Sequence, residues 1–136
     1  MPVPAESPRL INAKKFFMSL AASQLEEAAH LLSPEVTYTV PAGNSLSGVF
    51  HGPAEVKRHL IELFEFSHET YDVLKFSDWM VGESHVAMLQ DAQLQGNGKI
   101  YRGHQLFLVT FDQNDALSRI EVFFENQEAA NRFFSG

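Results

Sequence analysis

Two side chains near the middle of the chain are of types that could transfer a proton. Asn97-Gly98 is typical of a two-residue type I′ hairpin turn, which would place Asp91 directly opposite His104. A carboxylate that orients an imidazole is an arrangement used in general acid and base catalysis. The same two residues on the outer face of a sheet would form an ordinary cross-strand ion pair. The predicted register places the pair on that outer face, and both interpretations stay open.

The same register pairs two amides, Gln90 and Gln105, on the opposite face of the hairpin. Because side chains alternate between the faces of a sheet, this face also collects most of the apolar residues and should face the helices. The predicted inner set is Met88, Gln90, Ala92, Leu94, Tyr101, Gln105, Phe107, Val109, Phe111, Ile120, Val122 and Phe124. Buried amides need partners, so the two glutamines either satisfy each other or contact a ligand carbonyl.

Four other polar or aromatic residues are candidates for the same site. Tyr38 shares its parity with Val36 and Val40, so we expect its phenol to point inward. Trp79 is a candidate for the rim of a pocket, although the residues around it do not alternate cleanly. Asn44 and His51 lie between the first strand and the third helix.

Metal and cofactor chemistry are not predicted. The six histidines show neither H-x-H nor H-x-x-x-H spacing, and the chain has no cysteine. Gly96-Asn97-Gly98 joins two strands and opens no helix, so it is turn chemistry rather than a phosphate cradle. A G-x-S-x-G nucleophile motif is also absent from the sequence.

Three helices are expected before the hairpins. Apolar residues at helical spacing predict the first helix, over Phe16–Ala21 and its surroundings. The S-x-x-E pattern at Ser23 is typical of a capping box and predicts a second helix that ends at Ser33-Pro34. A third helix is expected after Gly52. Its apolar stripe is predicted to be Val56, Leu60, Ile61, Leu63 and Phe64, and its water-facing residues Lys57, Arg58, His59, Glu62 and Glu65.

Strands occupy most of the remaining chain. Alternating residues predict a short strand over Val36–Val40 and further strands over 70–81, 85–95, 99–111 and 117–125, before a last helix over Gln127–Phe134. A turn through Asp112–Asp115 would place Phe107 opposite Ile120 and Gln105 opposite Val122. This order predicts an α+β fold, with helices packed on one face of a curved antiparallel sheet.

The length and composition of the chain limit the number of domains and the classes of partner. The length of 136 residues predicts one domain, over 10–136, after a proline-rich disordered tail over 1–9. A net charge of -7 without basic runs argues against nucleic acid and anionic membranes as partners. No signal peptide and no apolar run long enough to span a bilayer is recognised, so a cytoplasmic protein is expected. The 12 phenylalanines suit a core, a pocket or an interface.

The order of elements resembles the nuclear transport factor 2-like superfamily, and within it the SnoaL-like and ketosteroid isomerase-like proteins. The resemblance covers about residues 11–134 and rests on the order and spacing of individually weak motifs. These are the segments 17–26, 32–38, 48–56 with its G-x-x-x-G-x-x-x-V pattern, 81–87 and 119–124. It implies a cone-shaped curved sheet wrapped around N-terminal helices, one deep apolar pocket, and a homodimer formed through the outer sheet face. It also implies that the segment with Asn44 and His51 borders the mouth of that pocket.

The resemblance also implies which catalytic groups this chain lacks. Ketosteroid isomerases carry a Tyr on the first helix, an Asp before the Pro that ends the first strand, and an Asp on the penultimate strand. In this sequence those positions fall on Phe16, Val40 and Phe107, none of which can move a proton. These three residues and Phe124 are therefore predicted to line the pocket rather than to catalyse that isomerisation.

We therefore expect a SnoaL-like protein that binds a small, mostly apolar molecule without a cofactor. If it is an enzyme, isomerisation, cyclisation or dehydration by acid and base catalysis is expected, with Asp91 and His104 as the evident proton-transfer pair. The alternatives are a non-catalytic binding protein and a dimerisation module whose cavity is filled by phenylalanines.

Overall fold

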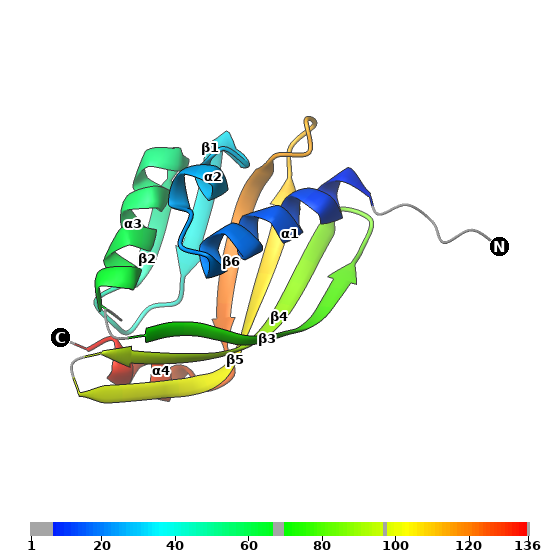
Figure 1. Cartoon of the computed structure of the whole chain (residues 1–136). Helices are drawn as coiled ribbons and strands as arrows, with labels where there is room; N and C mark the ends of the chain where they lie inside the picture. The colour runs from blue at the N-terminus through cyan, green and yellow to red at the C-terminus, as the bar shows by residue number, and fades with distance from the viewer. Residues whose placement is uncertain (1–6, 67–69, 97, 136) are drawn as a thin grey trace.

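The computed structural model describes residues 7–66, 70–96 and 98–135, which form one six-stranded curved sheet and four helices. Figure 1 shows α1, α2 and α3 over one face of the sheet, and α4 beside the first part of β5. The elements in chain order are α1 (Pro8–Ala21), α2 (Leu25–Ala29), β1 (Leu32–Val40), β2 (Gly48–His51), α3 (Gly52–Phe66), β3 (Thr70–Val81), β4 (His85–Gly96), β5 (Lys99–Phe111), β6 (Leu117–Phe124) and α4 (Gln127–Phe133).

The sheet confirms the predicted α+β class. Its strand order is β2-β1-β6-β5-β4-β3, so the last four strands form the expected antiparallel meander. One ladder differs from the expected antiparallel sheet, because β1 runs parallel to β6. Parallel neighbours need a long connection, and the chain between β1 and β6, which includes α3 and four strands, supplies it.

The predicted register of β4 and β5 is correct. Gln90 lies opposite Gln105, and Asp91 lies opposite His104. Every second residue of β4 from Val86 to Gly96 is buried, and the residues between them are partly exposed. All twelve residues of the predicted inner set are buried, except Phe124, which is partly exposed. Asn97, in the predicted turn, lies outside the described residues.

The predicted register of β5 and β6 is wrong by two residues. Phe107 lies opposite Val122 instead of Ile120, and Gln105 lies opposite Phe124 instead of Val122. Phe111 lies opposite Leu117 instead of Ala116, and the Asp112 N–H donates to Ala116 O at 2.9 Å, so the turn is one residue longer than expected; a register shift between Thr110 and Phe111 adds the second residue. Because side chains alternate with period two, a shift of two leaves every residue on its predicted face.

Several predicted boundaries need correction at the N-terminal side. Helix α1 begins at Pro8, inside the expected tail, because the Ser7 hydroxyl accepts the Leu10 N–H at 3.2 Å; residues 1–6 lie outside the described ranges. The capping box is not formed, since Ser23 is left-handed (φ 59°) and Gln24 precedes α2 without a side-chain cap. Helix α2 ends at Ala29, and β1 begins earlier than predicted, at Leu32. Strand β2 was not expected.

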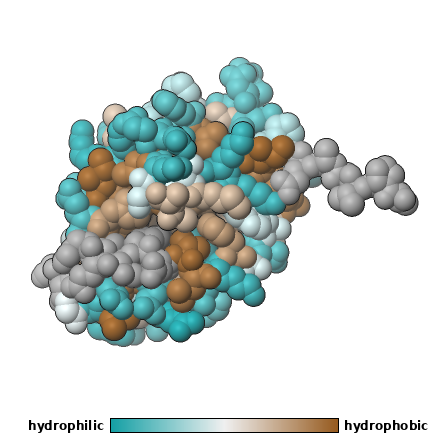
Figure 2. Space-filling model, in the orientation of Figure 1, coloured by the Kyte–Doolittle hydropathy of each residue, from teal (hydrophilic) through white to brown (hydrophobic). Residues whose placement is uncertain are grey.

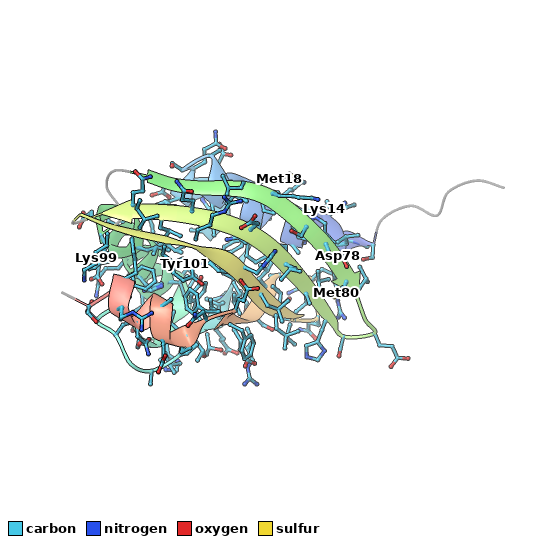
Figure 3. All side chains as sticks on the ribbon, turned by 90° about the horizontal axis from the view of Figure 1, so that it is seen from below. Lys14, Met18, Asp78, Met80, Lys99 and Tyr101 are labelled. Atoms are coloured by element: carbon cyan, nitrogen blue, oxygen red, sulfur yellow. The ribbon has the colours of Figure 1, made fainter. Side chains whose placement is uncertain are left out.

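A clasp, defined here as residues 41–47 together with α4, closes one end of the fold. The Asn44 amide donates to Asn131 Oδ1 at 2.9 Å, and Ser45 Oγ donates to the Phe134 carbonyl. Leu46 is buried in a second apolar cluster with Tyr101, Phe133 and Phe134, among others. Figure 3 shows Lys99 and Tyr101 on the part of β5 beside α4. The clasp is thus held by both hydrogen bonds and apolar packing.

The clasp gives a stability prediction at Gly43. This residue has φ +122°, and a Cβ there would overlap the Asn131 amide. Gly43→Ala should therefore lower the free energy of unfolding by about 2 kcal/mol or more, measured by urea denaturation. Gly82→Ala is the control, because its Cβ would meet only ordinary contacts, the nearest at 3.6 Å, and its change should stay within about 0.5 kcal/mol. Equal effects of the two substitutions would contradict the role of Gly43.

Candidate functional site

A pocket lies between the helices and the inner face of the sheet. The empty volume of the pocket, including the part that is open to solvent, is about 500 Å³. The part that is wide enough to admit a water molecule is about 30 Å³. Its lining residues come from α1, β1, the clasp, α3, β5, β6 and the C-terminal end. They are Leu20, Tyr38, Val40, Leu46, His59, Leu60, Leu63, Phe64, Gln105, Phe107, Val122, Phe124 and Phe134.

Three polar side chains interrupt this apolar lining. Tyr38 on β1, His59 on α3 and Gln105 on β5 are each only 3% exposed. Gln105 Oε1 accepts a hydrogen bond from Gln90 Nε2 at 2.6 Å, as expected for paired buried amides. Gln90 itself is buried, but it is not among the lining residues. Gln105 therefore connects the glutamine pair to the pocket.

His59 is the site residue that the sequence analysis missed. It was predicted to face water, whereas the structure buries it, and Ile61 of the predicted stripe is 37% exposed. The buried stripe of α3 is Val56, His59 and Leu60, which follows the i, i+3, i+4 spacing of one helix face. That spacing was visible in the sequence. His59 was assigned to the wet face because histidine is usually less buried than the aliphatic residues around it.

The imidazole of His59 is held between two aromatic rings. It stacks on Phe50 at 4.3 Å between centroids with an interplanar angle of 22°, and it lies 5.3 Å from the Tyr38 ring. Its Nδ1 is buried and has no hydrogen-bond partner within the described part of the chain. A buried polar atom without a partner is costly, and in native structures it often marks a functional group or an unseen ligand.

The surroundings of His59 keep it uncharged. Burial lowers the pKa of the imidazole from 6.5 to about 4, because the protonated form loses its hydration. The charged neighbours on α3 (Glu55, Arg58 and Glu62) are exposed. At neutral pH His59 is therefore a neutral imidazole, with one nitrogen that donates a hydrogen bond and one that accepts.

The other residues predicted to line the pocket divide into two groups. Val40, Phe107 and Phe124 lie on its wall. Phe16 is fully buried in the main core without lining the pocket. The ring centroids of Trp79 and Phe17 are 6.1 Å apart, and the Lys14 ammonium lies over the Trp79 ring. Trp79 is not among the residues that line the pocket. Two register shifts in β3, near residues 74 and 77, explain why the sequence around Trp79 does not alternate.

The two residues predicted at the pocket mouth have local structural contacts. Besides bonding Asn131, Asn44 accepts the Leu46 N–H at 2.9 Å, so it organises the clasp. His51 is exposed, and its backbone N–H donates to Glu55 Oε1 at 3.2 Å, next to the start of α3. Neither residue is among those that line the pocket.

Asp91 and His104 face away from the pocket, on the outer side of the sheet. Their side chains have separate ionic partners: Asp91 Oδ2 lies 3.6 Å from Arg102, and His104 Nδ1 lies 3.2 Å from Glu125 Oε2. The His104 backbone N–H and then its imidazole hold the pKa of Glu125 below its ordinary value. The structure thus brings the two backbones together without directing the side chains at the pocket.

Charged and metal-binding groups are sparse around the pocket. In the ranges that the structure describes, no Asp, Glu, Lys or Arg lines it, and no three His, Asp or Glu side chains gather in a way that could hold a metal ion. His68 lies outside these ranges. Among the helices that the structure describes, none is long and apolar enough to cross a membrane.

Comparison with known proteins identifies the fold. No family model and no curated protein matches the sequence. Among solved structures, the chain is similar to a protein of unknown function with a cystatin-like fold from Xanthomonas campestris, with a TM-score of 0.87, 20% identity, and coverage of 94% of this chain and 98% of that one. A nuclear transport factor 2-like protein from Burkholderia pseudomallei gives a TM-score of 0.83 and 17% identity over 96% and 100% of the two chains.

A third similar structure contains a ligand. It is a Mycobacterium tuberculosis protein in complex with estradiol-17beta-hemisuccinate, with a TM-score of 0.74 and 12% identity over 90% of this chain and 97% of that one. At these identities the similarity establishes architecture and leaves function to the site. The chain has the cystatin-like, nuclear transport factor 2-like fold.

Burial of a neutral histidine predicts a pH dependence of stability. Below pH 6.5 the unfolded chain protonates His59, whereas the folded chain does so only near pH 4, so folding loses free energy as the pH falls. Between pH 8 and pH 5 the wild type should lose about 2 kcal/mol more than His59→Phe. Urea denaturation at both pH values measures this difference. All other titratable groups are common to both proteins, so an equal loss would show that His59 is not buried neutral.

Proposed function

We propose that this protein binds a small, mostly apolar molecule in the pocket between α3 and the inner face of the sheet. The observation that carries the proposal is the buried, unpartnered Nδ1 of His59, a residue that lines a predominantly apolar wall. Ligand pockets typically combine predominantly apolar linings with a few placed polar groups. Here Tyr38, His59 and Gln105 are those groups.

The size of the pocket limits the ligand. The space wide enough for water, about 30 Å³, accommodates about two water molecules, so an organic ligand must displace some lining side chains. Leu46 and Phe134 belong to the clasp and its C-terminal extension, which the Ser45 hydroxyl joins by donating to the Phe134 carbonyl. We expect this side of the pocket to yield when a ligand enters. A single-ring compound is a suitable first probe.

The M. tuberculosis protein supports a binding role, since it is a chain of similar fold in complex with estradiol-17beta-hemisuccinate. Cofactor-free isomerisation, cyclisation or dehydration is the second candidate, because Tyr38 and His59 carry exchangeable protons on the pocket wall. Binding without chemistry is preferred, since a histidine with a pKa of about 4 is a weak base at neutral pH.

The proposal includes a homodimer formed through the outer face of the sheet. Figure 2 shows the apolar residues of the opposite, helix-bearing side as separate groups among polar ones. On the outer face Phe123 is 43% exposed and borders a shallow hollow with Leu89, Leu106 and His104. Charges of both signs surround these residues, as in Arg102–Asp91 and Arg119–Glu121. A second copy of the same face would offer apolar contacts and opposite charges.

Binding can be tested with the hydrocarbon α-methylstyrene in a ¹⁵N-NMR titration. The wild type should show saturable shifts centred on residues that line the pocket. Leu60→Trp fills the pocket and should weaken binding at least about tenfold, because the ligand loses its apolar contacts. Ile61→Trp is the matched control, since it adds the same ring to the exposed side of the same helix. Absent saturable binding, or equal weakening in both variants, would reject the proposed pocket.

Dimer formation can be tested by analytical ultracentrifugation over a concentration series. Phe123→Asp places a charge in the proposed interface and should raise the dimer dissociation constant at least about tenfold. Met18→Asp is the control, because Met18 is also an exposed apolar residue (51%) but lies on α1, on the side of the helices (Figure 3). A monomeric wild type, or the same dissociation in both variants, would refute the proposed interface.

A further inference from the structure

The pocket wall carries no formal charge in the part of the chain that the structure describes. Ten of its thirteen lining residues are apolar, and the other three are Tyr38, His59 and Gln105. A charged ligand group would therefore lose its hydration without an opposite charge to replace it. A neutral polar group loses far less, provided that it finds a hydrogen bond.

A ligand can form a hydrogen bond with His59 only at the edge of its ring, where the two nitrogens lie. Phe50 stacks on one side of the imidazole at 4.3 Å, and the Tyr38 ring lies 5.3 Å away. A neutral imidazole has one N–H donor and one bare nitrogen acceptor in its ring plane. A carbonyl oxygen can accept from the first, and a hydroxyl can serve either nitrogen. Each of these groups is uncharged and small enough to accompany an apolar skeleton.

The strongest competing ligand chemistry is a carboxylate paired with protonated His59. That pair needs a charged imidazole, whereas burial lowers the pKa of His59 to about 4 and so favours its neutral form at pH 7. The pair would also have to repay the desolvation of both charges. Tyr38 is the titratable side chain that packs against the ring, while His51, Glu55, Arg58 and Glu62 nearby are exposed. None of these supplies a buried countercharge.

We infer that the pocket selects uncharged ligands that carry a hydroxyl or carbonyl group, and that the edge of the His59 ring is the hydrogen-bonding group that selects them. This inference rests on the proposed binding function and adds the chemical class of the ligand. It makes His59 a specificity-determining residue, distinct from the residues that supply apolar contact.

Three probes of nearly equal shape test the inference. Acetophenone is the neutral carbonyl compound, α-methylstyrene replaces its oxygen by CH₂, and benzoate replaces its methyl group by a charged oxygen. At pH 7 the wild type should bind acetophenone at least about tenfold more tightly than benzoate. His59→Phe should weaken acetophenone binding at least about fivefold and change α-methylstyrene binding less than about twofold.

The outcomes separate this inference from the proposed function. If α-methylstyrene does not bind the wild type, the pocket proposal fails. If it binds but His59→Phe weakens both neutral probes equally, or if benzoate equals acetophenone, only the selection of neutral polar ligands fails. Benzoate binding at pH 7 that His59→Phe abolishes would instead support the charged pair and overturn the inference.

A measurement on the unmodified protein covers the case in which His59→Phe does not fold. In protein labelled with ¹⁵N-histidine, acetophenone should move one ring-nitrogen resonance of His59, because a new hydrogen bond forms at that atom. At equal occupancy α-methylstyrene should move it much less. Equal shifts with both probes would show that the ring edge does not contact the ligand oxygen, and would overturn the inference.

Discussion

The register of β4 against β5 is the constraint on which the rest of the structure depends. Because side chains alternate, pairing Gln90 with Gln105 also decides that Asp91 and His104 face outward. A slip of one residue would bury those two ionisable groups and expose Met88 and Leu94, which are fully buried. The apolar content of the inner face therefore enforces the register, and the register in turn determines which polar groups can reach the pocket.

The sequence was informative wherever a two-residue period or a strong turn signal operated. The bounds of β3 and β5 are those predicted, and the β4–β5 register is correct in detail. The second hairpin failed because turn length and a register shift near Thr110 depend on local backbone bonds that residue types do not specify. This error in the register does not change the predicted faces, because a shift of two residues leaves each side chain on the same side of the sheet.

The candidate site was only partly predictable, for a different reason. Tyr38, Val40, Gln105, Phe107 and Phe124 follow from strand parity, and all five line the pocket. The burial of His59 could be predicted only by deciding which side of α3 faces the core. The usual solvent exposure of histidine argued against burial, whereas its helical spacing from Val56 and Leu60 argued for it. Phe50 and Tyr38 resolve this conflict in the fold, since their rings cover the imidazole. Such tertiary shielding cannot be seen in a single helix pattern.

Burial of His59 also bears on whether this pocket is built for proton transfer or for recognition. A base works best when its pKa lies near the working pH, and the desolvation that removes water from His59 moves its pKa well below that range. Phe16, Val40 and Phe107 are buried and apolar, and Val40 and Phe107 line the pocket together with His59. The burial that weakens His59 as a base preserves it as a neutral hydrogen-bonding group. A low-dielectric wall strengthens such a bond. The aromatic content of this chain therefore favours recognition of an uncharged polar group over its chemical conversion.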